Sequence, residues 1–408
     1  MNGQLESRWL QVGNRALEHA RVLAGCGRGS ATPAEAAAAR YVQEALAQLG
    51  IRNVRRQPFR GLRSLWLFLA LAFGLALVGH AAMWMLRGPL GVWPALAVSV
   101  VAFGMSGTLL WRKFTFRSYP LQEALPHGSS QNVLAVIPPQ GDVHQRIVLL
   151  SHLDSHRAVI WFASDWLVRA YTLVSPLVVG GVAAAPLFYA AWAATDWPVL
   201  GWIGLAWGLL HFLGWFTGVT ADLGPYSPGA NDNAAAVGVS LALTERLAGA
   251  PLEHTEVWLA FTGCEETGCD GMLALLREQK EALKHALFID LELPGIGERL
   301  AYLPAEGVVR RKRIPQDVEQ LVRQVGARFG LQAAPGSAAG YFPEPGAAWE
   351  HIDFGIEPAS YDDGYQPAFD RPDLFGDARL RQAFALCIDR QRIVDTVLDG
   401  LSAVPDSY

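Results

Sequence analysis

Four stretches of the chain contain no Asp, Glu, Lys or Arg, and each is long enough to cross a membrane. They are Ser64–Leu86, Gly88–Trp111, Ala170–Thr195 and Trp197–Ala221. Each exceeds the about 20 apolar residues that a helix needs to span the hydrocarbon core of a bilayer. Buried helices of a soluble protein seldom lack every charge over such a length. The four stretches therefore predict membrane-spanning helices, with Trp and Tyr near several of their ends, as at membrane interfaces.

The stretches fall into two pairs, and each pair is joined by a short turn. Residues Arg87–Gly91 join the first pair and Asp196–Pro198 join the second, which predicts transmembrane hairpins at 64–111 and 170–221. Lys and Arg flank the outer ends of the hairpins, whereas the turns contain only Arg87. Because basic residues favour the cytoplasmic side of a membrane, we expect the polar part of the chain and both termini to be cytoplasmic.

The rest of the sequence is polar enough to form a domain. Charged residues make up 17% of the 408 residues, against about 25% in a typical soluble protein, and the hairpins account for the shortfall. The net charge is −5, without a long basic run, which argues against nucleic-acid binding. The four cysteines do not form a disulfide framework and fit a reducing compartment.

Residues 1–63, 112–169 and 222–408 alternate between helix and strand patterns. The segment Thr32-Pro33-Ala34-Glu35 has the form of a capping box that begins a helix. Such alternation is typical of a mixed, mostly parallel sheet covered by helices on both faces. Chemistry on these sheets collects in the loops beyond the carboxyl ends of the strands. The expected strands are 132–137, 147–150, 256–261 and 286–289, and the expected helices are 234–247, 268–279, 317–329 and 378–398.

Four short polar segments lie at the ends of these elements. Each alone has an ordinary structural explanation, such as a turn, a helix cap or a solvated face. Together they provide one imidazole and several carboxylates, a ligand set that suits zinc. An Asp two residues after a His can orient the imidazole, and of two adjacent glutamates one can bind metal while the other accepts a proton from water. The segments are Ser151-His152-Leu153-Asp154-Ser155, Gly229-Ala230-Asn231-Asp232-Asn233-Ala234, Gly263-Cys264-Glu265-Glu266-Thr267-Gly268 and Ile289-Asp290-Leu291-Glu292.

In this order the segments resemble the co-catalytic zinc aminopeptidases, a family whose relatives include glutamate carboxypeptidase II, the transferrin receptor and glutaminyl cyclase. The resemblance covers nearly the whole chain apart from the hairpins, and it implies an α/β fold of the zinc-exopeptidase type. It also implies a role for each matching residue. His152 matches a ligand of one metal, Asp154 the residue that orients it, Asp232 the carboxylate that bridges two metals, Glu265 the general acid/base, Glu266 a ligand of the second metal, and Asp290 the remaining ligand of the first.

The sequence departs from the family at the last metal ligand. Where the family has a His near its C-terminus, this chain has Gln366, between Tyr365 and Pro367. A carboxamide is a poorer zinc ligand than an imidazole. His351 is a candidate replacement, although it matches a family position that is not usually a ligand and can instead form a loop hydrogen bond. We therefore expect one or two zinc ions per chain.

These observations predict a membrane-bound metallo-exopeptidase that hydrolyses peptide or amide bonds, with Glu265 as general acid/base. One alternative is a metal-dependent deacylase or a glutaminyl-cyclase-like enzyme. Another is a metal-free protein with a binding or scaffold role at the membrane, which the replacement by Gln366 favours. The expected substrates are peptides or acyl amino acids. Because the hairpin at 170–221 lies between His152 and Asp232, either it directs the site toward substrates associated with the lipid bilayer or it only anchors the domain.

Overall fold

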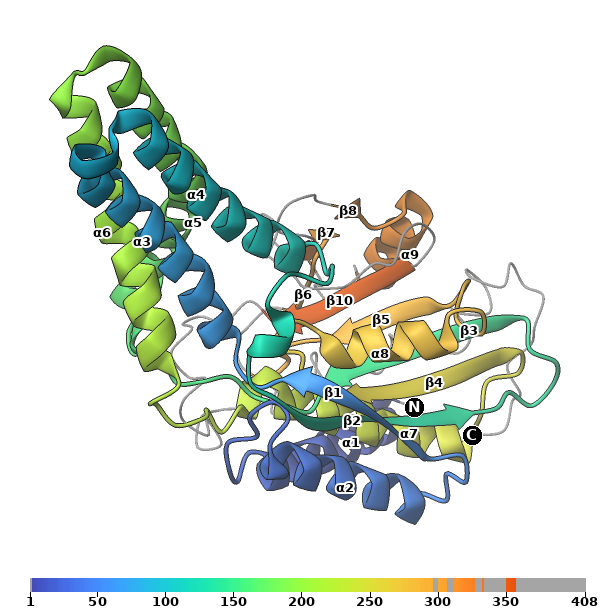
Figure 1. Cartoon of the computed structure of the whole chain (residues 1–408). Coiled ribbons are helices and arrows are strands. Elements are labelled where there is room, and N and C mark those ends of the chain that lie inside the picture. Colours follow the sequence, from blue (N-terminus) through green and yellow to red (C-terminus); the bar gives the residue numbers. More distant parts are fainter. Residues whose placement is uncertain (1, 296–299, 307–311, 327–331, 334–349, 357–408) are drawn as a thin grey trace. The chain divides into compact units, whose positions relative to one another are not determined.

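The computed structural model describes residues 2–295, 300–306, 312–326, 332–333 and 350–356 (Figure 1). The chain divides into two units. The first, here called the α/β unit, contains residues 1–63, 127–156 and 226–408. The second, the helical unit, contains residues 64–126 and 157–225. The helical unit is thus formed by two insertions into the sequence of the α/β unit.

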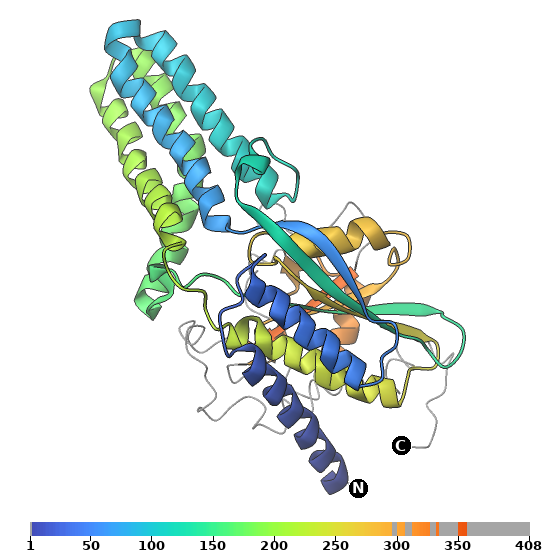
Figure 2. The same ribbon diagram turned by 60° about the horizontal axis from the view of Figure 1, so that its bottom comes forward.

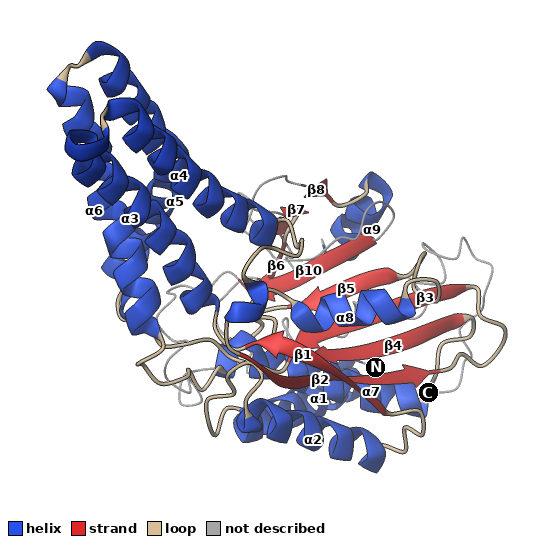
Figure 3. Ribbon diagram, viewed as in Figure 1, coloured by secondary structure: helices blue, strands red, loops and turns tan. Residues whose placement is uncertain are grey.

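A mixed sheet is the centre of the α/β unit, with eight strands among the described residues (Figure 3). Its strand order is β1-β2-β4-β3-β5-β10-β6-β9. The middle strands β4, β3, β5 and β10 run parallel. Strand β2 pairs antiparallel with β4 and with β1, β6 pairs antiparallel with β10, and β9 pairs parallel with β6. The expected mixed sheet is confirmed. The strands are β1 (Arg55–Leu62), β2 (His127–Ile137), β3 (Gln145–His152), β4 (Thr255–Thr262), β5 (Leu287–Leu291), β6 (Leu300–Tyr302), β9 (Gln332–Ala333) and β10 (Glu350–Ile356), with a separate pair β7 (Ala305–Glu306) and β8 (Lys312–Arg313).

Helices cover both faces of this sheet, as expected. Helices α1 (Asn2–Leu23), α2 (Pro33–Gln48) and α7 (Ala236–Gly249) lie on one face, and α8 (Asp270–Gln279) lies on the other (Figure 2). The described part also includes α9 (Gln316–Gly326). Every second residue of the central strands faces α2 and α7, because successive side chains of a strand point to opposite faces. The buried core on that face includes Val42, Leu46, Leu149, Leu241, Leu259 and Ile289. The helix expected at 378–398 lies outside the described residues.

The capping box at the start of α2 is confirmed in part. Thr32 Oγ1 accepts a hydrogen bond from Glu35 N at 3.4 Å, and Pro33 occupies the first turn. The Glu35 carboxyl does not return to Thr32. It accepts from Ala31 N at 3.2 Å, from Ser130 Oγ at 2.8 Å and from Cys264 N at 2.9 Å. Glu35 therefore links α2 to β2 and to the turn that follows β4.

The helical unit contains four long helices, each apolar and long enough to cross a membrane by length and composition. They are α3 (Leu65–Leu90), α4 (Val92–Phe114), α5 (Asp165–Thr195) and α6 (Pro198–Ala221), and the short helices η1 (Gln122–Ala124) and η2 (Ile160–Phe162) belong to the same unit. Large apolar side chains on these helices are exposed, among them Leu173 at 73% and Leu209 at 74%. Such a surface is unusual for a protein in water.

The limits of the helical unit differ from the predicted hairpins at 64–111 and 170–221. Helix α4 continues to Phe114 and α5 already begins at Asp165. Residues 112–126, 157–169 and 222–225, which we expected in the α/β domain, therefore group with the helices. Helices α4 and α5 extend beyond the uncharged runs because a charged residue does not end a helix, and Lys and Arg are good helix formers. A search for uncharged runs, in contrast, ends at the first charge.

A cluster of buried polar side chains lies inside the helical unit. His80 Nδ1 is 2.7 Å from Tyr189 Oη, and His80 Nε2 is 2.9 Å from His211 Nδ1. His211 Nε2 is 3.1 Å from the carbonyl oxygen of Val178. Because that carbonyl can only accept, His211 donates from Nε2 and accepts at Nδ1 from His80, which accepts in turn from the Tyr189 hydroxyl. One neutral tautomer of each imidazole therefore satisfies every contact.

Candidate metal centre and active site

His152 is the last residue of β3 and lies at the carboxyl end of the parallel strands. Its side chain is 2% exposed. Its Nε2 atom is 3.0 Å from Asp232 Oδ1, 3.4 Å from Glu292 Oε2 and 3.9 Å from Glu265 Oε2. Three of the four polar segments noted in the sequence thus converge on one imidazole nitrogen.

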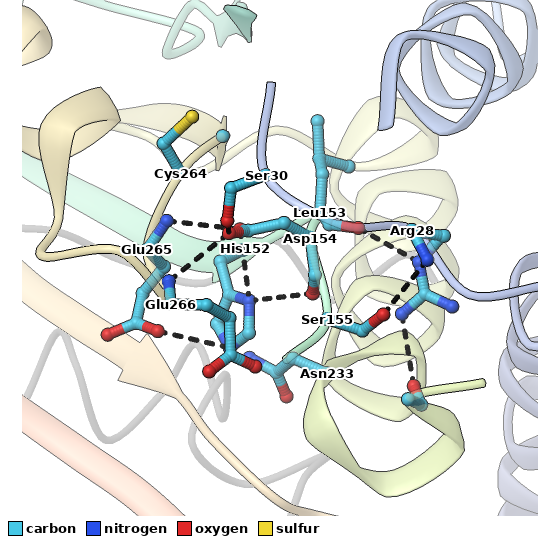
Figure 4. A network of polar contacts seen from close by, with 12 residues as sticks. Arg28, Ser30, His152, Leu153, Asp154, Ser155, Asn233, Cys264, Glu265 and Glu266 are labelled. Carbon is cyan, nitrogen blue, oxygen red and sulfur yellow. Dashed lines mark hydrogen bonds and ion pairs between the residues drawn. The ribbon is translucent and has the colours of Figure 1, made fainter. Parts of the chain in front are cut away.

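Asp154 lies beneath this imidazole and is fully buried. Its backbone oxygen is 3.1 Å from His152 Nδ1, and its Oδ1 is 3.5 Å from the same nitrogen. Figure 4 shows its carboxylate accepting from Ser30 Oγ at 2.6 Å and from the backbone N–H groups of Glu265 and Glu266 at 3.1 Å each. Asp154 therefore contacts both the imidazole and the turn that carries the two glutamates. This is the contact that the predicted orienting role requires.

Asp232 lies in a π-helical turn, η3 (Ala230–Ala235), directly before α7. Its backbone leaves the helical region, with φ −111° and ψ 92°, and the Asp232–Asn233 peptide bond is cis. The amide side chains on either side tie this turn to the end of β5 and to the segment that follows it. Asn233 Nδ2 donates to Leu291 O at 2.8 Å, and Asn231 Oδ1 accepts from Gly295 N at 2.7 Å.

The two glutamates lie on a tight turn after β4. The Glu265 carbonyl accepts from Gly268 N at 2.7 Å and from Cys269 N at 2.9 Å. The Glu265 side chain accepts from Cys269 Sγ at 3.5 Å. The Glu266 side chain has a ligand atom within 4.8 Å of ligand atoms of both His152 and Asp232. Its Oε1 atom is buried and has no hydrogen-bond partner among the described residues.

Glu292 is the site residue that the sequence analysis did not single out. In the sheet, Leu150 of β3 pairs with Asp290 of β5. Two residues further along parallel strands, His152 comes beside Glu292 rather than beside Asp290. Asp290 lies one step back, where its charge acts on the carboxyls of Glu265 and Glu292. The expected strand ends at 150 and 289 would have placed His152 beside residue 291, one residue away from the observed register, so they did not indicate Glu292. The predicted role of Asp290 as a ligand stays a prediction.

The pKa values of the cluster are shifted because several buried carboxylates surround one imidazole. Burial lowers the pKa of His152, but the charge of Glu292 and hydrogen bonds to Asp154, Asp232 and Glu292 outweigh it, so that the pKa lies well above its usual value. Burial, with the charges of Asp232 and Glu265, raises the pKa of Glu266 well above the usual value. Burial is also the largest cause that raises the pKa of Glu265, to about 7.

This donor set fits a divalent cation. His152, Asp232 and Glu266 form the one group of three potential metal-binding side chains in the part of the chain that the structure describes. A bound cation would reduce the repulsion between these carboxylates. It would also give a partner to the buried Oε1 atom of Glu266. An imidazole with carboxylates is a common ligand set for zinc.

The predicted last ligand cannot be placed in this geometry. Gln366 lies outside the described residues. His351 belongs to β10, where its backbone is paired with Phe288 of β5, but its side chain is not among those described. Both assignments stay predictions.

Comparison with known proteins shows a similarity in the segment that carries most of this site. Residues 216–343 match the model of Peptidase family M28. This part of the chain is therefore similar to the M28 peptidases. The matched M28 segment includes Asp232, Glu265, Glu266, Asp290 and Glu292, whereas His152 precedes it and reaches the site through β3.

Solved structures to which the chain is similar include aminopeptidases. An aminopeptidase from Aneurinibacillus sp. strain AM-1 is similar with a TM-score of 0.51 and 14% identity, over 96% of each chain. A zinc aminopeptidase from Bacillus subtilis has a TM-score of 0.49 and 14% identity, over 94% of this chain and 95% of its own. A glutaminyl cyclase from Bacteroides thetaiotaomicron has a TM-score of 0.48 and 14% identity, over 92% and 96%. No curated protein matches the sequence. The expected resemblance to the co-catalytic zinc aminopeptidases is confirmed.

Proposed function

We propose that this protein is a membrane-bound, zinc-dependent exopeptidase of the aminopeptidase type. One observation carries the proposal. The ligand atoms of His152, Asp232 and Glu266 lie within 4.8 Å of one another, and Glu265 lies beside them, with Oε2 3.9 Å from His152 Nε2. A scaffold has no physical need for so many buried carboxylates around one imidazole, because each raises the free energy of the folded chain unless a cation compensates it.

We assign the metal-binding residues from the contacts of His152. His152, Asp232 and Glu292 would hold one zinc ion, and Asp232 and Glu266 would hold a second. Asp290 is the alternative to Glu292, and Gln366 or His351 is the candidate to complete the second site. A zinc ion in this position supplies Lewis-acid polarisation of the substrate carbonyl and acidifies water.

We assign to Glu265 the proton transfer of this reaction. It would take a proton from the attacking water and deliver it to the leaving amine. Its pKa of about 7, raised mainly by burial, suits a group that must both accept and donate near neutral pH. The Cys269 thiol donates to Glu265 Oε1, while Oε2 lies on the side of His152.

The four apolar helices of the helical unit are the basis for the proposed membrane location. We propose that α3, α4, α5 and α6 span the bilayer, with the α/β unit on the cytoplasmic side, where the basic flanking residues would lie. The segment that contains α5 and α6 leaves the α/β unit after His156 and returns at Tyr226, between His152 and Asp232. This connection favours peptides or acyl amino acids associated with the bilayer as substrates. Single cysteines introduced in the two turns should be labelled from outside intact cells; labelling of Cys26 instead of the turns would reverse the topology.

A second candidate is amide chemistry with a single metal, such as cyclisation of N-terminal glutamine or removal of an acyl group. The observation that favours it is Gln366 at the position of the usual last His, which leaves the second metal with fewer ligands than the first.

A substrate screen on the detergent-solubilised, zinc-loaded protein distinguishes these functions. The substrates are peptides with a free N-terminus, N-acyl amino acids, and peptides that begin with glutamine. We expect release of the N-terminal residue, and we expect Glu265→Gln to lower kcat by about 10²–10⁴-fold with unchanged zinc content. Cyclisation or deacylation alone would support the second candidate. Zinc binding without turnover of any substrate would contradict an enzymatic function.

A further inference from the structure

Arg28 is a buried cation for which the proposed reaction has no direct use. It lies between α1 and α2 and is 2% exposed. Burial lowers its pKa to about 10, against the favourable charges of Asp154, Asp232 and Glu266, so the guanidinium is still charged at neutral pH. A buried charge raises the free energy of the folded chain unless its donors find acceptors. The acceptors of Arg28 therefore indicate which segments the guanidinium holds in place.

One set of contacts reaches the segment that follows β3. Arg28 Nε donates to the carbonyl of Leu153 at 2.9 Å, and Arg28 N donates to Ser155 Oγ at 2.9 Å (Figure 4). Ser155 N donates back to the Arg28 carbonyl at 3.2 Å. Leu153 is the residue directly after His152, so these bonds fix the position of the imidazole-bearing strand end.

The second set of contacts reaches the segment that leads to Asp232. Arg28 Nη1 donates to Pro228 O at 2.5 Å, and Nη2 donates to Gly229 O at 3.0 Å. Gly229 has φ +58°, and a Cβ there would lie 2.9 Å from Arg28 Nη2. The positive φ and the close approach of this backbone to Asp232 O, Ser155 Cβ and the guanidinium together favour glycine here. A third acceptor, Leu23 O at 2.7 Å from Nη1, joins the end of α1 to the same group.

Two serines connect the same two segments. Ser155 Oγ donates to the Ser227 carbonyl at 2.7 Å, and Ser227 N donates to the His156 carbonyl at 2.9 Å. Ser227 Oγ accepts from Gly229 N at 3.0 Å. Arg28, Ser155 and Ser227 therefore bridge the points where the chain leaves the α/β unit at His156 and returns at Tyr226. We call these three residues the arginine clasp.

We propose that Arg28 is a positioning residue for the metal centre, which holds the His152 and Asp232 segments at ligand spacing across the insertion of residues 157–225. The proposal rests on the function proposed above. Two ligands of one ion come from segments that the whole insertion separates, and closing a longer loop costs more conformational entropy. The clasp fixes both segments within the α/β unit itself, so that ligand spacing does not depend on the inserted helices. The planar guanidinium has several donors in fixed directions, so it can bind carbonyls of both segments at once, which the single ammonium group of a lysine cannot do.

The test is the zinc affinity of the full-length protein in detergent, measured by competition with a chromophoric chelator. Because residues that hold metal ligands in place are worth about 10–100-fold in affinity, we expect Arg28→Met to weaken zinc binding by that factor. Arg28→Lys keeps the charge but cannot reach both segments, and we expect it to weaken binding nearly as much. The matched control is Arg146→Met, at the other end of β3, where the arginine is partly exposed and paired with Glu256; its affinity should equal that of the intact protein.

Thermal unfolding of the metal-free variants separates positioning from general stability. A merely structural role would lower the unfolding temperature of Arg28→Met but leave the zinc affinity of the folded protein unchanged, and that result would overturn the proposal. If Arg28→Met does not fold, Arg28→Lys and Ser155→Ala decide, and intact affinity in both would equally overturn it. Failure of the intact protein to bind zinc would instead contradict the proposed function.

Discussion

The two units each enclose a cluster of buried polar side chains around histidine, and the two clusters differ in kind. In the helical unit, His80, His211 and Tyr189 form a chain of hydrogen bonds that ends on a backbone carbonyl and needs no charge. In the α/β unit, His152 faces several carboxylates, and the pKa values of Glu266 and Glu292 are raised well above normal, mainly by burial. The first cluster is complete by itself. The second contains more buried carboxylates than the nearby cations His152 and Arg28 can balance, which is why we interpret only the second as a metal centre.

The largest expected difference between the clusters is their response to metal removal. At a free zinc concentration about 1,000 times the Kd, bound zinc stabilises the folded α/β unit by about 4 kcal/mol, and a chelator removes this stabilisation. Hydrogen exchange followed by mass spectrometry should show loss of protection in β3 and β5 but not in α3 or α6. Equal loss of protection in both units would contradict the distinction.

The next effect concerns which carboxylate completes the ligand set of His152. Residues that only hold metal ligands in place contribute up to about 100-fold in affinity. Because Glu292 Oε2 lies 3.4 Å from His152 Nε2, we expect Glu292→Gln to weaken zinc binding by more than this factor. Asp290→Asn, two residues earlier and within β5, is the matched control, and its effect should stay within that range. The reverse order, measured by the same chelator competition, would assign the ligand to Asp290.

A separate effect, which depends on pH, is expected from Glu35, which is fully buried beneath the turn of Glu265. Burial is the main cause that raises its pKa from 4.5 to about 8. Between these pH values the folded chain keeps a proton that the unfolded chain has lost, so stability falls as pH rises, by up to about 1.4 kcal/mol per pH unit. Below pH 4.5 this penalty is absent, and above pH 8 it is constant.

The variant Glu35→Gln mimics the protonated carboxyl and should gain stability relative to the intact protein as pH rises from 5 to 8. Urea unfolding of the metal-free proteins at both pH values measures the gain. The exposed Glu44→Gln on the same helix is the control and should show none. A pH dependence that is the same in Glu35→Gln and in the intact protein would show that Glu35 ionises normally.

The smallest effect belongs to the neutral cluster. Interhelical hydrogen bonds in membrane proteins contribute about 0.6 kcal/mol on average and at most about 1.7 kcal/mol, so Tyr189→Phe should destabilise the helical unit by an amount in that range. Thr172→Val removes only a bond to Val168 O within α5 and serves as control. A destabilisation of Tyr189→Phe far above this range would mean that the cluster, like the other, depends on charge.

Local sequence patterns predicted those features of the fold that depend on residues close together in the chain. The start of α2 follows from Thr32 and Pro33, and the apolar helices follow from their uncharged runs. The strands β3 and β4 follow from β-branched runs, and their polar ends predicted His152 and Glu265. Each of these features is encoded within a few residues of the position it affects.

Features that depend on pairing between distant segments were not predicted. The role of Glu292 follows from the register of β3 against β5, which the sequence does not show. Apart from Leu23, the carbonyl partners of the Arg28 side chain lie 125 to 201 residues away, and every residue has a carbonyl. The contacts of His80 with Tyr189 and His211 depend on how helices pack. In each case a side chain finds its partner only after the chain has folded.

The most direct test of the account is the metal content of the purified, full-length protein after loosely bound ions are removed, measured as metal atoms per chain by mass spectrometry. We predict stoichiometric zinc, with one atom if only the site of His152, Asp232 and Glu292 fills and two if the site of Glu266 also fills, and we predict its loss in His152→Ala. A protein that stays free of metal when zinc is offered would contradict the central claim that the charged cluster is a metal centre.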